Sequence, residues 1–390
     1  MRYTELPLTE LLPVETLESL SAFLADPRYC PDDGAVPCFF DIETCGLSAK
    51  SAPVYMIGAV QPDDRGTYLF RQWCAERPSE EPALITAFAE SLPARCRLLH
   101  FNGTTFDLPF LRDRSNFLGL PPFPTPLSLD LYPPFRRLKT LAGLPSCRQR
   151  DLEPLAGYDR EDPYDGGTLI RFYSEFVGLS KCNLAAAEAR FHDLARHNRE
   201  DLLGLVSLCR LLPCLDIAQT PVEHAEIYSY ESDAVTLLLQ MPVAWPESLT
   251  LRRPVSRFLT LTSEPSCPDI TLSADGSGRI LLRIPLLTEP AKHYFDNYKD
   301  YIWLTHENRA VHRSVASLVD RSYRRAAKRD EAFEWSRGEL LPQTGDLFSP
   351  SFVLQKKDLC RLFPARELPK RPDLLPAYAA DLLQLFGKGN

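Results

Sequence analysis

CFFDIETCGLSAK, residues 38–50, is an apolar run that carries two carboxylates, Asp41 and Glu43. Side chains two residues apart in a β-strand share a face, so the two acids are predicted to point the same way. Apolar neighbours such as Phe40 and Ile42 indicate a buried strand, where adjacent carboxylates raise each other's pKa unless a cation lies between them. Carboxylate oxygens are the ligands that Mg²⁺ and Mn²⁺ prefer. The alternative is a pair of exposed acids just past the strand.

The segments around this strand predict a mixed α/β fold. Two further apolar runs follow it directly and are separated by turn residues, as in a meander, and helix-like and strand-like segments alternate afterwards. This order favours a mixed five-stranded sheet with helices on both faces. Strands are expected at residues 36–43, 54–60, 66–73, 97–101 and 127–133, and helices at 81–92, 107–120 and 183–212.

The chain of 390 residues is long enough for more than one domain. We predict a short N-terminal helical segment at residues 1–35, a catalytic α/β domain at 36–219 and a C-terminal α+β accessory domain at 220–390. In the last region, residues 309–329 contain seven Arg or Lys and one Asp, and their apolar spacing predicts a basic helix. Such a helix is either a solvated face or a track for phosphates.

Composition restricts the class of protein. The apolar content of 44 % is typical of a globular chain, and no run of about 18 apolar residues predicts a membrane span. The N-terminus lacks the pattern of a secretory signal. The 11 cysteines include no C-x-x-C pair, which favours free thiols in a reducing cytoplasm over a disulfide framework or a zinc ribbon.

Net charge also bears on function. Residues 1–219 hold 22 basic against 30 acidic side chains, which accounts for the whole net charge of −8. An acidic domain repels phosphate unless some of its acids hold cations.

Two further segments carry candidate ligands. In HFNGTTFDLPFLRDR, Asn102 follows a strand and Asp107 opens a helix. The alternative for Asp107 is a structural role, because an acid in the first turn of a helix interacts favourably with the helix dipole. In ARHNREDLLGL, His197 and Asp201 are four residues apart and therefore lie on one face of a helix. Asp201 interrupts the apolar stripe of that helix, although a weak surface pair would have the same spacing.

Together, D-x-E followed by G-L, then N-x-x-x-F-D-x-x-F-L, then H-x-x-x-D resemble the three motifs of the DEDD superfamily of 3′→5′ exonucleases, and within it the YprB-like subgroup. The resemblance covers about residues 36–215. It implies a ribonuclease H-like fold in which Asp41, Glu43, Asp107 and Asp201 bind two divalent cations, Mg²⁺ or Mn²⁺. It further implies that His197 is the general base.

Substrate contacts are expected close to these motifs. Gly46 and Leu47 would approach the terminal nucleotide, Asn102 would orient Asp107 or the phosphate, and Phe106 is either a stacking platform or a core residue. The expected reaction is hydrolysis of terminal phosphodiester bonds of DNA or RNA, with single-stranded 3′ ends as the substrate. Two alternatives stay open: a nucleic-acid-binding module with weak activity, and a structure-specific endonuclease.

Overall fold

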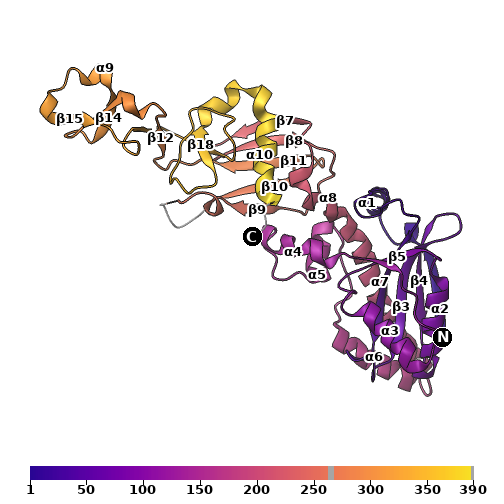
Figure 1. Ribbon diagram of the computed structural model, residues 1–390. Helices are drawn as coiled ribbons and strands as arrows, with labels where there is room; N and C mark the ends of the chain where they lie inside the picture. Colours follow the sequence, from indigo (N-terminus) through magenta and orange to yellow (C-terminus); the bar gives the residue numbers. More distant parts are fainter. Residues whose placement is uncertain (262–267, 388–390) are drawn as a thin grey trace. The chain divides into compact units, whose positions relative to one another are not determined.

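The computed structural model describes residues 1–261 and 268–387, and the chain divides into two compact units, Met1–Leu215 and Asp216–Asn390 (Figure 1). Each unit is built around its own β-sheet.

The first unit contains a mixed sheet of six strands in the order β1-β4-β3-β2-β5-β6. β2 lies at the centre, antiparallel to β3 and parallel to β5, which is in turn parallel to β6. The carboxyl ends of these three parallel strands therefore lie at one edge of the sheet. The strands are β1 (Arg2–Pro7), β2 (Val36–Thr44), β3 (Val54–Pro62), β4 (Tyr68–Cys74), β5 (Cys96–His100) and β6 (Leu127–Asp130).

The sheet has one strand more than the sequence predicted. β1 comes from the N-terminal segment that we expected to be helical, and it pairs antiparallel with β4 from Arg2↔Cys74 to Pro7↔Leu69. A short alternating segment such as RYTELP gains strand structure only when it pairs with an existing edge, so the local pattern does not reveal it. The predicted helix follows as α1 (Val14–Leu24).

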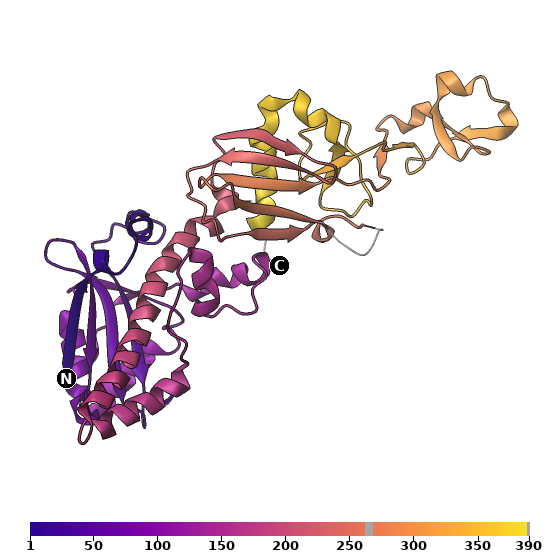
Figure 2. The same cartoon turned by 180° about the vertical axis from the view of Figure 1, so that it is seen from behind.

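Helices cover both faces of this sheet (Figures 1 and 2). On one face, α2 (Glu81–Ser91) and α3 (Asp107–Leu118) pack on a core that includes Phe40 and Ile42 of β2. On the other face, α6 (Gly166–Leu179) and the long α7 (Leu184–Leu208) pack on Tyr55 and Met56 of β3. Asp41 and Glu43 alternate with Phe40 and Ile42, so they point toward α7.

A buried ion pair holds α3 and the loop after β2 in place. Arg114 of α3 donates to Glu81 at the start of α2, with Nε 2.7 Å from Oε1, and it also donates to the carbonyl of Ala49 at 2.9 Å. Glu81 accepts the backbone N–H of Val54 at 2.8 Å. These bonds link the start of β3 and the 45–53 loop to the helix that Asp107 opens.

The second unit is an antiparallel sheet of five strands in the order β7-β8-β11-β10-β9, with α10 (Leu375–Gly387) packed beside β7 and β8. Smaller two- and three-stranded sheets complete it. The strands of the main sheet are β7 (His224–Tyr230), β8 (Ala234–Gln240), β9 (Leu251–Pro254), β10 (Asp269–Ala274) and β11 (Ile280–Pro285). The smaller sheets contain β12 (Lys292–Tyr294), β13 (Tyr301–Leu304), β14 (Arg309–His312), β15 (Arg324–Ala326), β16 (Phe333–Trp335), β17 (Leu340–Gln343) and β18 (Arg361–Pro364).

The basic helix predicted within residues 309–329 is wrong. This segment holds β14, the one-turn helix α9 (Arg313–Ala316) and β15, because β13 lies between the two strands and pairs with both. Long-range pairing overrides the helical spacing of the apolar residues. Acidic side chains also neutralise part of the positive charge. For example, Oε1 of Glu331 lies 2.6 Å from the guanidinium of Arg325.

Two features of the described residues concern membranes and thiols. None of their helices combines the length and the apolar character that crossing a bilayer requires. Nine cysteines among them have free thiols: Cys30, Cys38, Cys45, Cys74, Cys96, Cys147, Cys182, Cys209 and Cys214.

Candidate active site

Asp41 and Glu43 lie at the end of β2, on the face that α7 covers. The pairing of β2 with β3 shifts register between Glu43 and Thr44, which is a β-bulge. Bulges re-aim the side chains beside them and occur often next to active sites. Glu43 is 12 % exposed and lies within 3.5 Å of the hydroxyl of Tyr55.

α7 brings His197 and Asp201 to these acids. Nε2 of His197 lies 3.2 Å from Oδ2 of Asp201 and 3.7 Å from Oε1 of Glu43. One ligand atom from each of the three residues falls within 4.8 Å of the other two. Asn183 caps the start of α7 by accepting the N–H of Ala186 at 3.1 Å.

Asp107 approaches the cluster from α3. The loop from β5 turns at Asn102, whose φ of 63° is left-handed, and a Cβ at Gly103 would lie 2.9 Å from Oδ2 of Asp107. The absence of a side chain at Gly103 therefore lets the loop pass close to this carboxylate. Asp107 is buried, and backbone groups at Asp107 and Ile42 hydrogen-bond to it.

The charges of the four acids act on one another. Burial, followed by the charges of Asp201, Glu43 and Asp107, raises the pKa of Asp41 well above its usual value. Burial raises the pKa of Glu43 to about 7, with His197 opposing the rise and Asp201 adding to it. Burial likewise raises the pKa of Asp107 to about 7. Carboxylates with raised pKa values are poised to bind cations, which remove the repulsion between them.

Sequence reasoning missed Asn198, the neighbour of His197. Asn198 is completely buried; its amide donates to Oδ2 of Asp41 at 3.0 Å and accepts from Gln72 at 2.9 Å. Gly58 of β3 makes room for it, since a Cβ there would lie 2.2 Å from Oδ1 of Asn198. Asn198 lies three residues before Asp201 on the same helix face, so its position in the motif was a usable signal.

No pattern in the sequence points to Asp162. This buried carboxylate belongs to the loop before α6 and lies 2.5 Å from Nδ1 of His197. Arg150 donates to the same carboxylate at 2.7 Å. Burial lowers the pKa of His197, but the bond to Asp162 and the charges of Asp201 and Glu43 outweigh it and raise the pKa to about 9.

Arg160, from the same loop, is a third missed residue. Its guanidinium lies 2.6 Å from Oδ1 of Asp201 and donates twice to Glu153, at 2.8 and 2.6 Å. Its side chain is only 8 % exposed. An internal cation therefore compensates Asp201 and Glu153 from the side opposite His197.

The predicted substrate-binding residues lie around the cluster in different environments. Leu47 is 89 % exposed, and Gly46 accepts the hydroxyl of Thr44 at 2.8 Å. Phe106 packs on Phe110 with ring centroids 5.3 Å apart, as a core residue would. Asn102 accepts the hydroxyl of Thr105 at 3.1 Å through its side chain, whereas no bond joins it to Asp107.

The donor set fits divalent cations. Glu43, His197 and Asp201 offer ligand atoms within 4.8 Å of one another, and the charges of Asp107, Glu43 and Asp201 act on Asp41 beside them. Hard oxygen ligands of this kind suit Mg²⁺ or Mn²⁺. The carboxylates of Glu43, Asp107 and Asp201, with that of Asp41, are the groups that would hold them.

Comparison with known proteins supports the fold. Residues 38–212 match the RNase_H superfamily. The first unit therefore has the ribonuclease H-like fold that the sequence predicted. No curated protein matches the chain significantly.

Two solved proteins align with part of the chain. The family B DNA polymerase of the hyperthermophilic archaeon Pyrobaculum calidifontis aligns over 47 % of this chain and 25 % of its own, with 16 % identity and a TM-score of 0.36. Exonuclease I of E. coli, in a complex with a dT13 oligonucleotide, aligns over 52 % of this chain and 55 % of its own, with 12 % identity and a TM-score of 0.31. The zinc-bound complex of the same enzyme with single-stranded DNA aligns over 52 % and 54 %, with 13 % identity and a TM-score of 0.29. The chain thus spans a quarter of the polymerase and about half of exonuclease I.

Proposed function

We propose that the first unit is a metal-dependent nuclease that removes nucleotides from 3′ ends of DNA or RNA, of the YprB-like kind that its motifs resemble. The observation that carries this proposal is the meeting of Asp41, Glu43, Asp107 and Asp201 beside His197, although they come from three distant segments. Free thiols at nine of the described cysteines agree with action in a reducing cytoplasm.

The chain's own residues have distinct roles in this proposal. Two divalent cations, when bound by the four carboxylates, would supply charge stabilisation at the scissile phosphate and at the attacking water. Asp162 accepts Nδ1–H of His197 and so leaves the lone pair on Nε2, which faces the carboxylates. Once the charges of Glu43 and Asp201 are neutralised, burial lowers the pKa of His197, and Nε2 accepts the proton of the water. Asn198 holds Asp41 in place by its amide.

A degradation assay tests the proposal. A 5′-labelled single strand of DNA or RNA, incubated with Mg²⁺ or Mn²⁺, should give a ladder that shortens from the 3′ end. Asp41→Ala should lower the rate on the order of 10³-fold or more and leave the fold intact, because it removes a ligand of the cations. Asp113→Ala, which changes an exposed acid of α3, is the matched control. A parental rate for Asp41→Ala would show that the site is assigned wrongly.

A circular single strand separates the alternatives. An exonuclease leaves it intact, whereas a structure-specific endonuclease opens circles that carry hairpins. A binding module with weak activity would retain the labelled strand without producing a ladder.

A further inference from the structure

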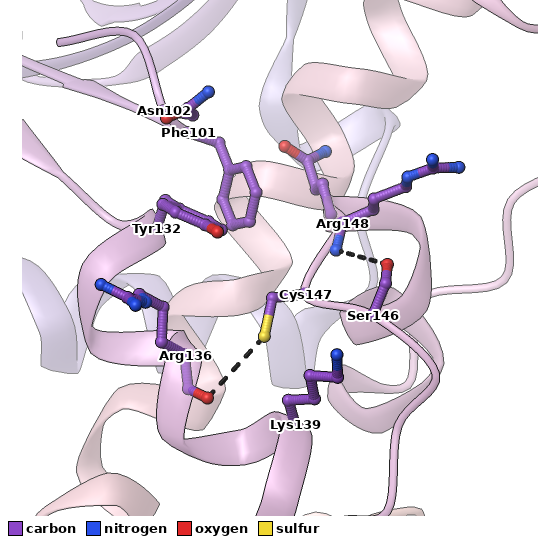
Figure 3. A pocket seen from close by; sticks show the side chains of 9 residues that line it. Phe101, Asn102, Tyr132, Arg136, Lys139, Ser146, Cys147 and Arg148 are labelled. Atoms are coloured by element: carbon purple, nitrogen blue, oxygen red, sulfur yellow. Dashed lines mark hydrogen bonds between the residues drawn. The ribbon is translucent and has the colours of Figure 1, made fainter. Parts of the chain in front are cut away.

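A basic pocket of about 740 Å³ lies beside the candidate active site, within the first unit (Figure 3). Its size falls within the usual range of pockets for small molecules and cofactors. It is formed by the loop after β5, by α4 (Tyr132–Leu141) and by the segment that leads into α5 (Gln149–Leu152). The lining residues are Phe101, Asn102, Tyr132, Arg136, Lys139, Ser146, Cys147, Arg148 and Gln149.

Two aromatic rings form one wall of the pocket. Phe101 and Tyr132 lie edge to face, with ring centroids 5.5 Å apart (Figure 3). Asp130 fixes both segments, since its carboxylate accepts the N–H of Asn102 at 2.8 Å and that of Tyr132 at 3.0 Å. The rings are therefore held on a rigid base, which is the arrangement that stacking with a nucleobase requires.

Three cations face the same pocket. Arg136, Lys139 and Arg148 are exposed, and none of them forms an ion pair within the described residues. Tyr132, Arg136 and Lys139 are spaced four and three residues apart in α4, so they share one face of the helix. No carboxylate is among the nine lining residues. In a unit whose net charge is negative, this patch is selective for anions.

The pocket is connected to the catalytic cluster through Gln149. Its amide donates to the backbone carbonyl of Asp201 at 2.7 Å and to Oε1 of Glu153 at 2.8 Å. On the other side of the pocket, the residue after Asn102 is Gly103, whose backbone passes close to the carboxylate of Asp107. The pocket walls are thus continuous with the segments that hold two of the four acids.

We propose that this pocket holds a nucleotide of the single-stranded substrate upstream of the bond that is cleaved, which rests on the function proposed above. The base stacks on Tyr132, and Arg136, Lys139 and Arg148 bind the adjacent phosphates. A duplex keeps its bases stacked inside the helix, so the pocket selects an unpaired strand. Phosphate contacts and stacking do not read the base, so the preference for sequence is weak.

Binding without hydrolysis tests this proposal directly. The whole chain is titrated, in EDTA, into fluorescein-labelled dT15 and U15, and anisotropy gives the Kd. The triple change Arg136→Ala, Lys139→Ala and Arg148→Ala should weaken binding about 10-fold or more and reduce the slope of log K against log[salt] by about 2. Tyr132→Ala should weaken binding about 10-fold, whereas Tyr132→Phe keeps the ring and the affinity.

A charge-matched control shows whether binding of the single strands depends on the pocket or only on the net charge of the protein. Arg65, Arg95 and Lys181 are exposed basic residues outside the pocket, and their combined change to Ala should leave the Kd within about 2-fold. The proposal is overturned if both triple variants bind alike, if the parent does not bind the single strands, or if a blunt duplex of equal length binds as tightly.

Hydrolysis of the p-nitrophenyl ester of thymidine 5′-phosphate separates this inference from the proposed function. That ester has no upstream nucleotide, so the pocket variant should hydrolyse it at the parental rate while losing kcat/KM on dT15. A parent that binds dT15 through the pocket but hydrolyses neither substrate would refute the nuclease and leave the pocket assignment standing. An active parent whose pocket variant keeps full kcat/KM on dT15 would refute the pocket alone.

Discussion

Asp162 and His197 form a buried pair in which Oδ2 lies 2.5 Å from Nδ1. The carboxylate fixes one ring nitrogen, so the other, Nε2, is directed at Glu43 and Asp201. Arg150 donates to the same oxygen, Oδ2, at 2.7 Å and so holds Asp162 in place. The candidate base is therefore oriented by a loop that belongs to none of the three motifs.

Asp162→Ala should lower kcat about 10- to 100-fold with little change in KM, because His197 loses the partner that sets its tautomer and ring orientation. Steady-state kinetics on a labelled single strand measure this split. Asp162→Glu, which keeps the carboxylate, should recover part of the loss. Asp165→Ala in the same loop removes an exposed acid that caps α6 and is the control. Parental kcat for Asp162→Ala would contradict this role.

The metal-free protein should lose stability as the pH rises through about 7. The pKa values of Glu43 and Asp107 are raised to about 7 in the folded chain, so the folded state holds protons that the unfolded state releases at lower pH. Their stabilising effect is complete below about pH 4 and is lost as the pH passes 7. The Tm in EDTA should therefore fall between pH 5.5 and 8.5.

Mg²⁺ should restore the Tm at pH 8, since cations replace the lost protons. Asp107→Asn should make the Tm depend less on pH, because it removes one of the two carboxyl groups that titrate near pH 7. A Tm that neither falls with pH nor responds to Mg²⁺ would show that the acids are not coupled in one site.

Gly58→Ala should impair both stability and activity. A Cβ at this position would lie 2.2 Å from Oδ1 of Asn198 and 2.4 Å from Leu202, so α7 must move away from β3. Overpacking of this kind costs about 1–3 kcal/mol of unfolding free energy, and the shift separates His197 from the strand acids. Gly178→Ala in α6 is the control, because a Cβ there meets nothing within 4 Å. Urea unfolding and kcat together measure the effect; an unchanged kcat would argue against this packing constraint.

Arg160→Ala should destabilise the fold by about 3–5 kcal/mol, because it leaves Glu153 and Asp201 without their buried counter-ion. Urea unfolding in EDTA gives the value. Arg171→Ala removes an ion pair with Glu175 in which both side chains are exposed. This change should lower the free energy of unfolding by less than about 1 kcal/mol. Equal effects of the two changes would mean that Arg160 is not a structural cation.

The strand and helix patterns predicted the elements that carry the acids, because periodicity reports burial and burial fixes which face a side chain takes. Their places on β2, α3 and α7 made Asp41, Glu43, Asp107 and Asp201 candidates, and the resemblance to the exonuclease motifs joined them into one predicted site. β1 was missed because its strand structure depends on pairing with β4, a contact between residues about 70 positions apart. The same long-range pairing overturned the helix predicted at residues 309–329.

Asp162 and Arg160 could not be predicted on these grounds. Both lie in an irregular loop, DREDPYD, whose acidic and basic side chains have no period that would relate them to α7. Their contacts depend on where the loop crosses the helix, which only the folded chain determines. The pocket around Tyr132 escaped notice for the same reason, since α4 and the segment before α5 meet only in space.

The carboxyl ends of β2, β5 and β6 share one edge of the sheet. Asp41 and Glu43 lie on β2 and Asp107 opens the helix after β5, whereas Tyr132, Arg136 and Lys139 lie in α4, after β6. Residues 131–149, which line most of the proposed substrate pocket, thus contain none of the four acids of the proposed metal site. Grafting residues 131–149 from a homologue should retune which polymer is accepted without rebuilding the catalytic core.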